Sequence, residues 1–152
     1  MHKAWATKNG FTIIELLVTI VVIGILATIM IVSYTGIQQR SRDTDRGNDI
    51  TQLKIAIEKY HADRSQYPDV CSGGDDVECA ASSLATVLVP TYLKVIPHDP
   101  RNTADSAMDY RYIRGNPTTD SYGLLVTNEA KSSCKTGQNI NASWWTSTVP
   151  SC

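Results

Sequence analysis

Apolar residues concentrate in one run near the start of the chain. Of the 22 residues from Phe11 to Val32, 17 are apolar and only Glu15 is charged. As an α-helix this run would be about 33 Å long, which is enough to cross a hydrocarbon layer about 30 Å thick. The pattern therefore predicts a transmembrane helix over residues 11–32.

The helix is predicted to continue beyond the apolar run. Residues 38–49 are charged on nearly every side, which predicts a solvated helix segment, although pairing of these charges between copies of the chain is an alternative. Within it, Arg42 with Asp45 and Asp43 with Arg46 have the i,i+3 spacing at which opposite charges meet on a helix face.

Apolar residues then return every three or four positions, which predicts a helix face that packs on a later part of the chain. These residues are Ile50, Leu53, Ala56, Ile57 and Tyr60. Because Pro68 disfavours helix at the residue before it, the helix should end near Arg64. The sequence thus predicts a long N-terminal helix within residues 11–65.

Short strand-like runs dominate residues 66–152, which form the predicted globular head. A short helix over Ser83–Leu88, capped by Ser82 or Ser83, precedes strands at 109–114, 121–127 and 140–146. These strands predict an antiparallel meander that packs on the apolar helix face. The fold class is α+β.

The four cysteines lie in this polar head. They allow three pairings, and the pairing local in sequence, Cys71 with Cys79 and Cys134 with Cys152, is favoured. Closing the longer loop could stabilise a small head by about 3 kcal/mol. Disulfides in turn indicate an oxidising compartment outside the cytoplasm.

The overall charge balance excludes a strongly basic nucleic-acid-binding protein, because 14 Lys and Arg stand against 15 Asp and Glu. Lys3 and Lys8 precede the apolar run without any acid, so the N-terminus should stay in the cytoplasm and the head should lie outside. No A-x-A-like cleavage site follows the run. The small residue stands before it instead, at Gly10.

The basic leader, Gly10, Phe11, Glu15 and the following Leu-Leu-Val resemble the class III signal of the type IV pilin superfamily. The resemblance implies that prepilin peptidase removes residues 1–10 as a leader, cutting between Gly10 and Phe11, and that Phe11 is N-methylated. It also implies a homo-oligomeric helical filament, with Glu15 pairing with the amino terminus of a neighbouring subunit. The expected packing positions are Ile13, Leu16, Leu17 and Ile20.

Glu15 has an independent physical reason for a partner. A carboxylate in a bilayer core costs roughly 2.5–3.5 kcal/mol on insertion scales, and a cationic amine from another subunit would compensate it. The alternative is that Glu15 reaches water at the cytoplasmic interface and forms a capping box with Thr12 at the helix start. The two roles are compatible.

Residues 57–68, residues 92–100 and Tyr110-Arg111-Tyr112 resemble major pseudopilins and related pilins. After Asn128, however, the sequence lacks the Asp/Gly-rich calcium loop of major pseudopilins, which favours a type IV pilus subunit (fimbrium) for adhesion, twitching motility or DNA uptake. The alternatives are a minor pilin that binds DNA or a ligand at the tip, and a type II secretion pseudopilin. The implied partners are the membrane before assembly, the peptidase, an assembly platform and its ATPase machine.

Other candidate chemistry is sparse. Asp75, Asp76 and Glu78 could hold calcium, but three acids beside glycines more often form a solvated turn. His61 and His98 are isolated in sequence, so no catalysis, metal or cofactor is expected. Trp144 and Trp145 are predicted on opposite faces of a strand, with one exposed. Scattered cations are a weak signal for DNA phosphates; these are Arg111, Arg114, Lys131 and Lys135.

Overall fold

The computed structural model describes residues 10–101, 109–146 and 148–152, so Lys3 and Lys8 of the leader lie outside the described residues. The chain forms two compact units, Met1–Gln38 and Gln39–Cys152. Helix α1 (Ile13–Arg64) contributes residues to both units. Its start after Thr12 and its end at Arg64 confirm the predicted helix bounds.

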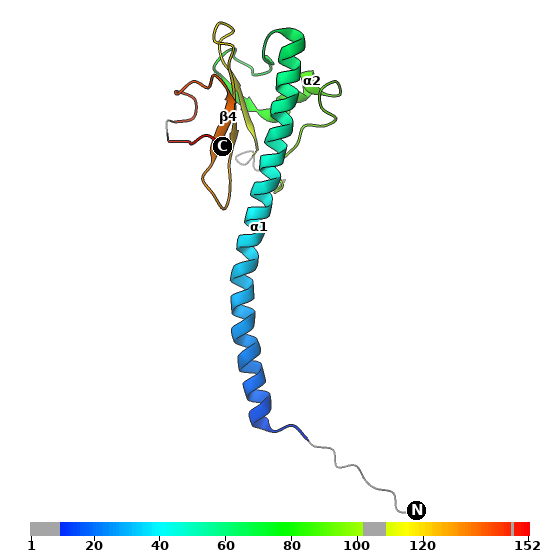
Figure 1. The fold of residues 1–152 in the computed structure, drawn as a ribbon, viewed down its shortest axis with the longest axis vertical. Coiled ribbons are helices and arrows are strands. Elements are labelled where there is room, and N and C mark those ends of the chain that lie inside the picture. The colour runs from blue at the N-terminus through cyan, green and yellow to red at the C-terminus, as the bar shows by residue number, and fades with distance from the viewer. Residues whose placement is uncertain (1–9, 102–108, 147) are drawn as a thin grey trace, which may run out of the picture. The chain divides into compact units, whose positions relative to one another are not determined.

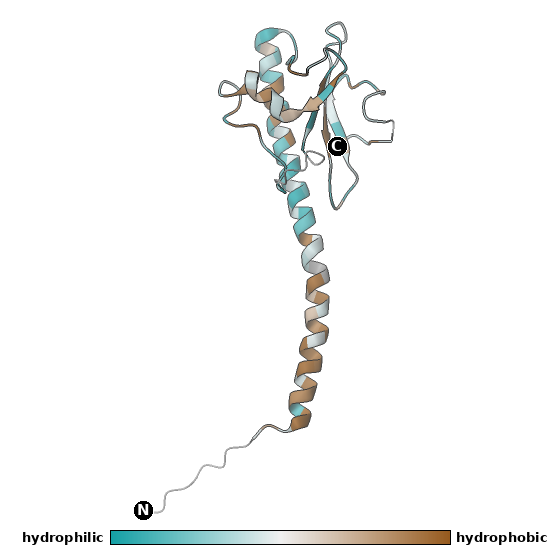
Figure 2. Ribbon diagram, turned by 180° about the vertical axis from the view of Figure 1, so that it is seen from behind, coloured by the Kyte–Doolittle hydropathy of each residue, from teal (hydrophilic) through white to brown (hydrophobic). Residues whose placement is uncertain are grey.

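In the first unit, α1 is apolar on all sides. Every side chain from Phe11 to Ile31 is exposed, and Figure 2 shows this stretch mostly in the brown of hydrophobic residues. A helix that is apolar all round needs an apolar environment. Among the described residues, α1 is the one helix long and apolar enough to cross a membrane.

The second unit contains a four-stranded antiparallel sheet beside the later part of α1 (Figure 1). The sheet order is β1-β2-β3-β4, and the strands are β1 (Glu78–Ala80), β2 (Arg111–Arg114), β3 (Tyr122–Val126) and β4 (Cys134–Gln138). Tyr112 of β2 lies opposite Leu124 of β3, which in turn lies opposite Thr136 of β4. The architecture confirms the α+β class.

The core of this unit lies between one face of the sheet and the predicted apolar face of α1. Ile50, Leu53, Ala56 and Ile57 are buried in one cluster with side chains of the sheet, and Tyr60 packs against that cluster. The sheet contributes alternate residues, as a half-buried strand should. They are Tyr112, Tyr122, Leu124 and Val126.

The predicted strand at residues 140–146 is wrong. The fourth strand is Cys134–Gln138, a polar segment whose pairing with β3 makes it a strand, and residues 140–146 leave the sheet. Asn139, Trp145 and Thr146 have φ angles of 46°, 49° and 30°, which an extended strand cannot accommodate. Trp144 and Trp145 are therefore loop residues and not the two faces of a strand.

The two tryptophans pack where the sheet has no side chain of its own. A Cβ on Gly123 would lie 2.7 Å from the Trp145 ring, and a Cβ on Gly115 would lie 3.0 Å from the Trp144 ring and 2.0 Å from Ser121 Oγ. Any larger residue at these glycines would displace the rings. Trp144 is buried and Trp145 is half-buried, so neither ring stands free on the surface.

The short helix in the head begins earlier than predicted. A 3₁₀ turn, η1 (Ala81–Leu84), leads directly into α2 (Ala85–Leu88). Neither N-cap residue, Ala80 or Leu84, makes a side-chain capping hydrogen bond, so the predicted serine cap is wrong. Burial of Leu84 and Leu88 in the core fixes this segment instead.

The disulfides join Cys71 to Cys79 and Cys134 to Cys152, the two pairs favoured by sequence separation. The second pair holds the C-terminal residues along β4. Lys135 N donates to Pro150 O at 2.9 Å and Cys152 N donates to Lys135 O at 3.0 Å. The chain end thereby pairs with part of the edge of the sheet.

Candidate functional site

The candidate processing and assembly segment is the start of α1, where Gly10 and Phe11 precede a capping box. Thr12 N donates to Glu15 Oε2 at 2.8 Å, and Glu15 N donates to Thr12 Oγ1 at 3.2 Å. The Thr12 hydroxyl also donates to Glu15 Oε2 at 2.7 Å. These reciprocal bonds satisfy amides that the helix itself leaves open, as the Thr-x-x-Glu spacing predicts.

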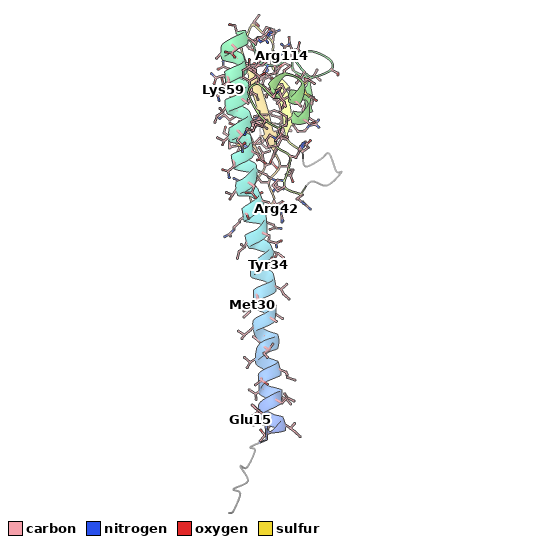
Figure 3. All side chains as sticks on the ribbon, turned by 90° about the vertical axis from the view of Figure 1, so that its right-hand side faces the viewer. Glu15, Met30, Tyr34, Arg42, Lys59 and Arg114 are labelled. Atoms are coloured by element: carbon pink, nitrogen blue, oxygen red, sulfur yellow. A yellow bond between two sulfur atoms is a disulfide. The ribbon has the colours of Figure 1, made fainter. Side chains whose placement is uncertain are left out.

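The capping box occupies one oxygen of Glu15 and leaves the carboxylate at the surface. Figure 3 shows Glu15 at the first turn of α1, and no positively charged group pairs with it among the described residues. The carboxylate can therefore accept a further bond from a cation outside the chain.

The predicted packing positions follow this carboxylate on the helix. These positions, each more than half exposed, are Ile13, Leu16, Leu17 and Ile20. None of them is buried in a core, because this part of α1 has no packing partner within its own unit. Such a surface suits lipid or other apolar helices.

The second unit contains a buried ionic group that sequence analysis missed. Arg46 is 0% exposed and is bonded to three carboxylates, so the predicted solvated helix segment at residues 38–49 is wrong here. Its guanidinium reaches Asp99 through two bonds of 2.6 and 3.0 Å. It also donates to Asp43 and to Glu129, both at 2.7 Å.

Two further interactions complete this group, which we call the Arg46 cluster and define as Arg42, Asp43, Arg46, Asp99 and Glu129. Arg42 donates to both oxygens of Glu129, at 2.8 and 2.7 Å, and not to Asp45 as the spacing suggests. Asp43 accepts the backbone amides of Glu129 and Ala130 at 2.9 and 2.8 Å. The cluster thus ties α1 to the loop at Asp99 and to the β3–β4 connection.

Proton affinities in the cluster favour its charged state. The two guanidinium groups of Arg42 and Arg46 lower the pKa of Glu129 to about 2, although partial burial acts in the opposite direction. For Asp43, burial raises the pKa, but hydrogen bonds from the Glu129 and Ala130 amides and from Arg46 lower it further than burial raises it. Both carboxylates are therefore held ionised.

The acids considered for calcium do not converge on a common point. Asp76 accepts from Trp144 Nε1 at 2.8 Å, Glu78 accepts from Trp145 Nε1 at 2.6 Å, and Asp75 pairs with Arg114. Among the described residues, no group of three or more His, Cys, Asp or Glu could hold a metal ion. The solvated-turn interpretation is also too simple, because each acid has a partner in the fold.

Most of the cations considered for DNA binding are already engaged. Arg111 pairs with Glu78, Arg114 pairs with Asp69 and Asp75, and Lys135 Nζ donates to Trp144 O at 3.2 Å. Of that set only Lys131 is exposed; the other three are half-buried.

His61 and His98 have different surroundings. His61 stacks on Tyr67, with ring centroids 4.2 Å apart, and its Nε2 lies 2.8 Å from Asp120 Oδ1, so it is not isolated. His98 is exposed.

Comparison with known proteins supports the resemblance found at the start of α1. Residues 5–31 match the family model described as "Prokaryotic N-terminal methylation motif". This range includes Gly10, Phe11 and Glu15.

The chain is similar to type II secretion system core protein G of Aeromonas hydrophila, at 30% identity over 61% of this chain and 67% of that protein. It is 28% identical to core protein G of Vibrio cholerae over 73% and 74% of the two chains. The chain is also 33% identical to the type IV major pilin protein PilA of Myxococcus xanthus, over 41% of this chain and 28% of that protein. No solved structure matches the chain significantly.

Proposed function

Because this chain belongs to the type IV pilin superfamily, we propose that it is a structural subunit of a helical filament. The observation that carries this proposal is the order of features at the start of α1: Gly10 and Phe11, then the Thr12–Glu15 capping box, then an apolar helix segment with exposed side chains. In the proposed pathway, prepilin peptidase cuts between Gly10 and Phe11 and methylates the new amine of Phe11.

The apolar helix anchors the precursor in the membrane. Its unpartnered side chains are stable in lipid, and in a filament they would be covered by the same helix of other copies. Ile13, Leu16, Leu17 and Ile20 are the positions proposed to pack there. Exchange of lipid for neighbouring helices keeps these residues away from water throughout assembly.

Glu15 is proposed to select the register of assembly. Within the part of the chain that the structure describes, its carboxylate is bonded only to Thr12, so it has acceptor capacity left for a cation. Cleavage of the leader creates such a cation at the amine of Phe11 in the next subunit. In an apolar filament core, this pair would be strongly preferred over either group alone.

Two machines could assemble the subunit. A type II secretion pseudopilus is supported by the core protein G relatives, which match the larger share of the chain. A type IV pilus is supported by the similarity to PilA and by the sequence after Asn128, which lacks the Asp/Gly-rich calcium loop that the resemblance implies for major pseudopilins. We propose the pseudopilus as the first candidate and the pilus as the second.

Substitution at Glu15 tests the filament function. We expect Glu15→Val to be inserted and cleaved but not assembled, measured by electron microscopy of sheared cell surfaces and by the mass of the membrane-bound protein. Thr12→Val is the matched control, because it removes the capping hydroxyl and keeps the carboxylate; it should still assemble. Normal filaments from Glu15→Val would contradict the proposal.

The assignment to one machine needs a separate experiment. Deletion of the gene is expected to block release of type II substrates if the subunit forms a pseudopilus. Loss of surface fibres with normal secretion would assign it to a pilus instead.

A further inference from the structure

A basic groove runs along one side of α1 in the second unit. It consists of two adjoining hollows of about 280 and 310 Å³ that share Lys131. Arg40, Thr44, Gly47, Thr51 and Lys54 line it from α1, at spacings of three and four residues that place them on one helix face. The β3–β4 connection and β4 form its other wall.

The groove carries excess positive charge. Its cationic side chains are Arg40, Lys54 and Lys131, whereas its one acidic side chain, Asp43, is already bonded to Arg46. Arg40 and Lys131 are exposed and have no carboxylate partner among the described residues. Lys54 Nζ donates to Thr136 Oγ1 at 3.2 Å. A negatively charged occupant would therefore meet three cations.

This chain also carries a segment of the opposite charge. Residues 69–79, which include the Cys71–Cys79 loop, contain four acids and no Lys or Arg. Arg111 and Arg114 neutralise part of this charge, which leaves a net charge of about −2. Of the acids in this segment that form ion pairs, Asp69 has the most accessible side chain, at 56% exposed.

The acidic segment lies near one end of the second unit, and the basic groove begins near the other end and extends along α1 to Lys54. Figure 3 shows Arg114, the partner of Asp69 and Asp75, near one end, and Arg42, on the same helical turn as Arg40, near the other. Between copies, such complementary surfaces would form a head-to-tail contact, which produces an open filament unless the rotation closes it into a ring.

We propose that the basic groove of one copy binds the acidic 69–79 segment of the next copy in the filament. This contact rests on the proposed filament function and adds to it a contact between heads. Opposite charges would bring the heads together and fix their register, and the reverse arrangement would set like charges against each other.

A charge swap in the full-length chain tests this contact. Lys131→Glu and Asp69→Lys are each expected to lower the number of filaments by roughly tenfold, because each sets like charges against each other. The double variant should restore assembly. Lys59→Glu is the matched control, since Lys59 is exposed on α1 and does not line the groove; it should assemble normally.

The outcomes separate this contact from the proposed function. If the parent chain forms filaments and the single reversals do too, or if the double variant is not restored, the contact is overturned and the filament function stands. If the parent chain forms no filaments, both are overturned. A third outcome is that Lys131→Glu forms the normal number of filaments but these filaments no longer bind DNA. This result would assign the groove to a polyanion and overturn the contact.

Discussion

Helix α1 reverses the usual distribution of side chains twice along its length. Over residues 11–31 its apolar side chains are exposed, and at residues 43 and 46 its charged side chains are buried. The exposed apolar side chains carry no free-energy cost where lipid or neighbouring helices of a filament surround them. The buried charges are stable only because each has bonded partners, with three carboxylates around Arg46. Burial on this helix follows the available partner and not the type of residue.

The largest expected effect comes from removing the central cation. Arg46→Met leaves Asp43, Asp99 and Glu129 without their common partner, which we expect to lower the free energy of unfolding by about 3–5 kcal/mol. Urea unfolding of the full-length chain in detergent micelles measures it. Arg40→Met is the matched control on the same helix and should change the value by less than about 0.5 kcal/mol. Equal stability of the two variants would show that the cluster does not hold the second unit together.

A comparable loss is expected at the C-terminal disulfide. Replacing Cys134 and Cys152 with serine opens a loop with a sequence separation of 18 and should lower stability by about 3 kcal/mol on the loop-entropy model. The matched pair Cys71→Ser and Cys79→Ser opens a separation of 8 and should cost slightly less, about 2.5 kcal/mol. Thermal unfolding compares the two. A larger loss from the shorter loop would mean that packing, and not loop closure, dominates.

Acid should reduce the stabilisation that the buried ion pairs give to the second unit and should leave the apolar segment unaffected. The pKa of Glu129 is about 2 in the folded chain, below its ordinary value of 4.5, so its contribution is fully present above about pH 4.5 and is lost as the pH falls toward 2. Asp43, whose pKa is also lowered, acts in the same direction. Unfolding measured between pH 6 and 2 should show this loss.

Glu129→Gln should flatten that pH profile. Asp45→Asn is the control, since Asp45 is exposed and forms no ion pair with the residues that the structure describes. An unchanged slope in Glu129→Gln would remove Glu129 from the account of acid stability.

The smallest effect on stability is expected in the apolar segment. Ile20→Ala should change unfolding of the second unit by less than about 0.5 kcal/mol, because Ile20 is exposed and has no packing partner there. Leu53→Ala, on the same helix but fully buried, should cost about 2–5 kcal/mol. Circular dichroism melting of both variants checks the contrast. A large loss in Ile20→Ala would contradict the view that this segment is not part of a folded core.

The sequence predicts the parts of the fold that follow from local patterns. A clear hydrophobic period or a nearby proline marks these parts: the ends of α1, its apolar face at Ile50–Ile57, and strands β2 and β3. Strand β4 has neither: its polar residues form a strand because they pair with β3, and the apolar run at residues 140–146 is a loop because its rings pack over Gly115 and Gly123. Pattern alone cannot distinguish these two cases.

The candidate site divides in the same way. The capping box at Thr12 and Glu15 is local and is predicted by its spacing. The Arg46 cluster joins residues 53 and 83 positions apart, and the i,i+3 spacing reveals only its Asp43–Arg46 pair. Asp99 and Glu129 are acids in predicted loops, which could have indicated ion pairs with α1. Nothing in the sequence, however, identifies the cation that each of them binds.

The most direct test of the central claim is the N-terminal mass of the subunit in sheared filaments. If the chain is processed and assembled as proposed, mass spectrometry will find a first peptide that begins at N-methylated Phe11. Assembled protein that still begins with residues 1–10 would contradict both the cleavage at Gly10 and the pairing of Glu15 with a new amine.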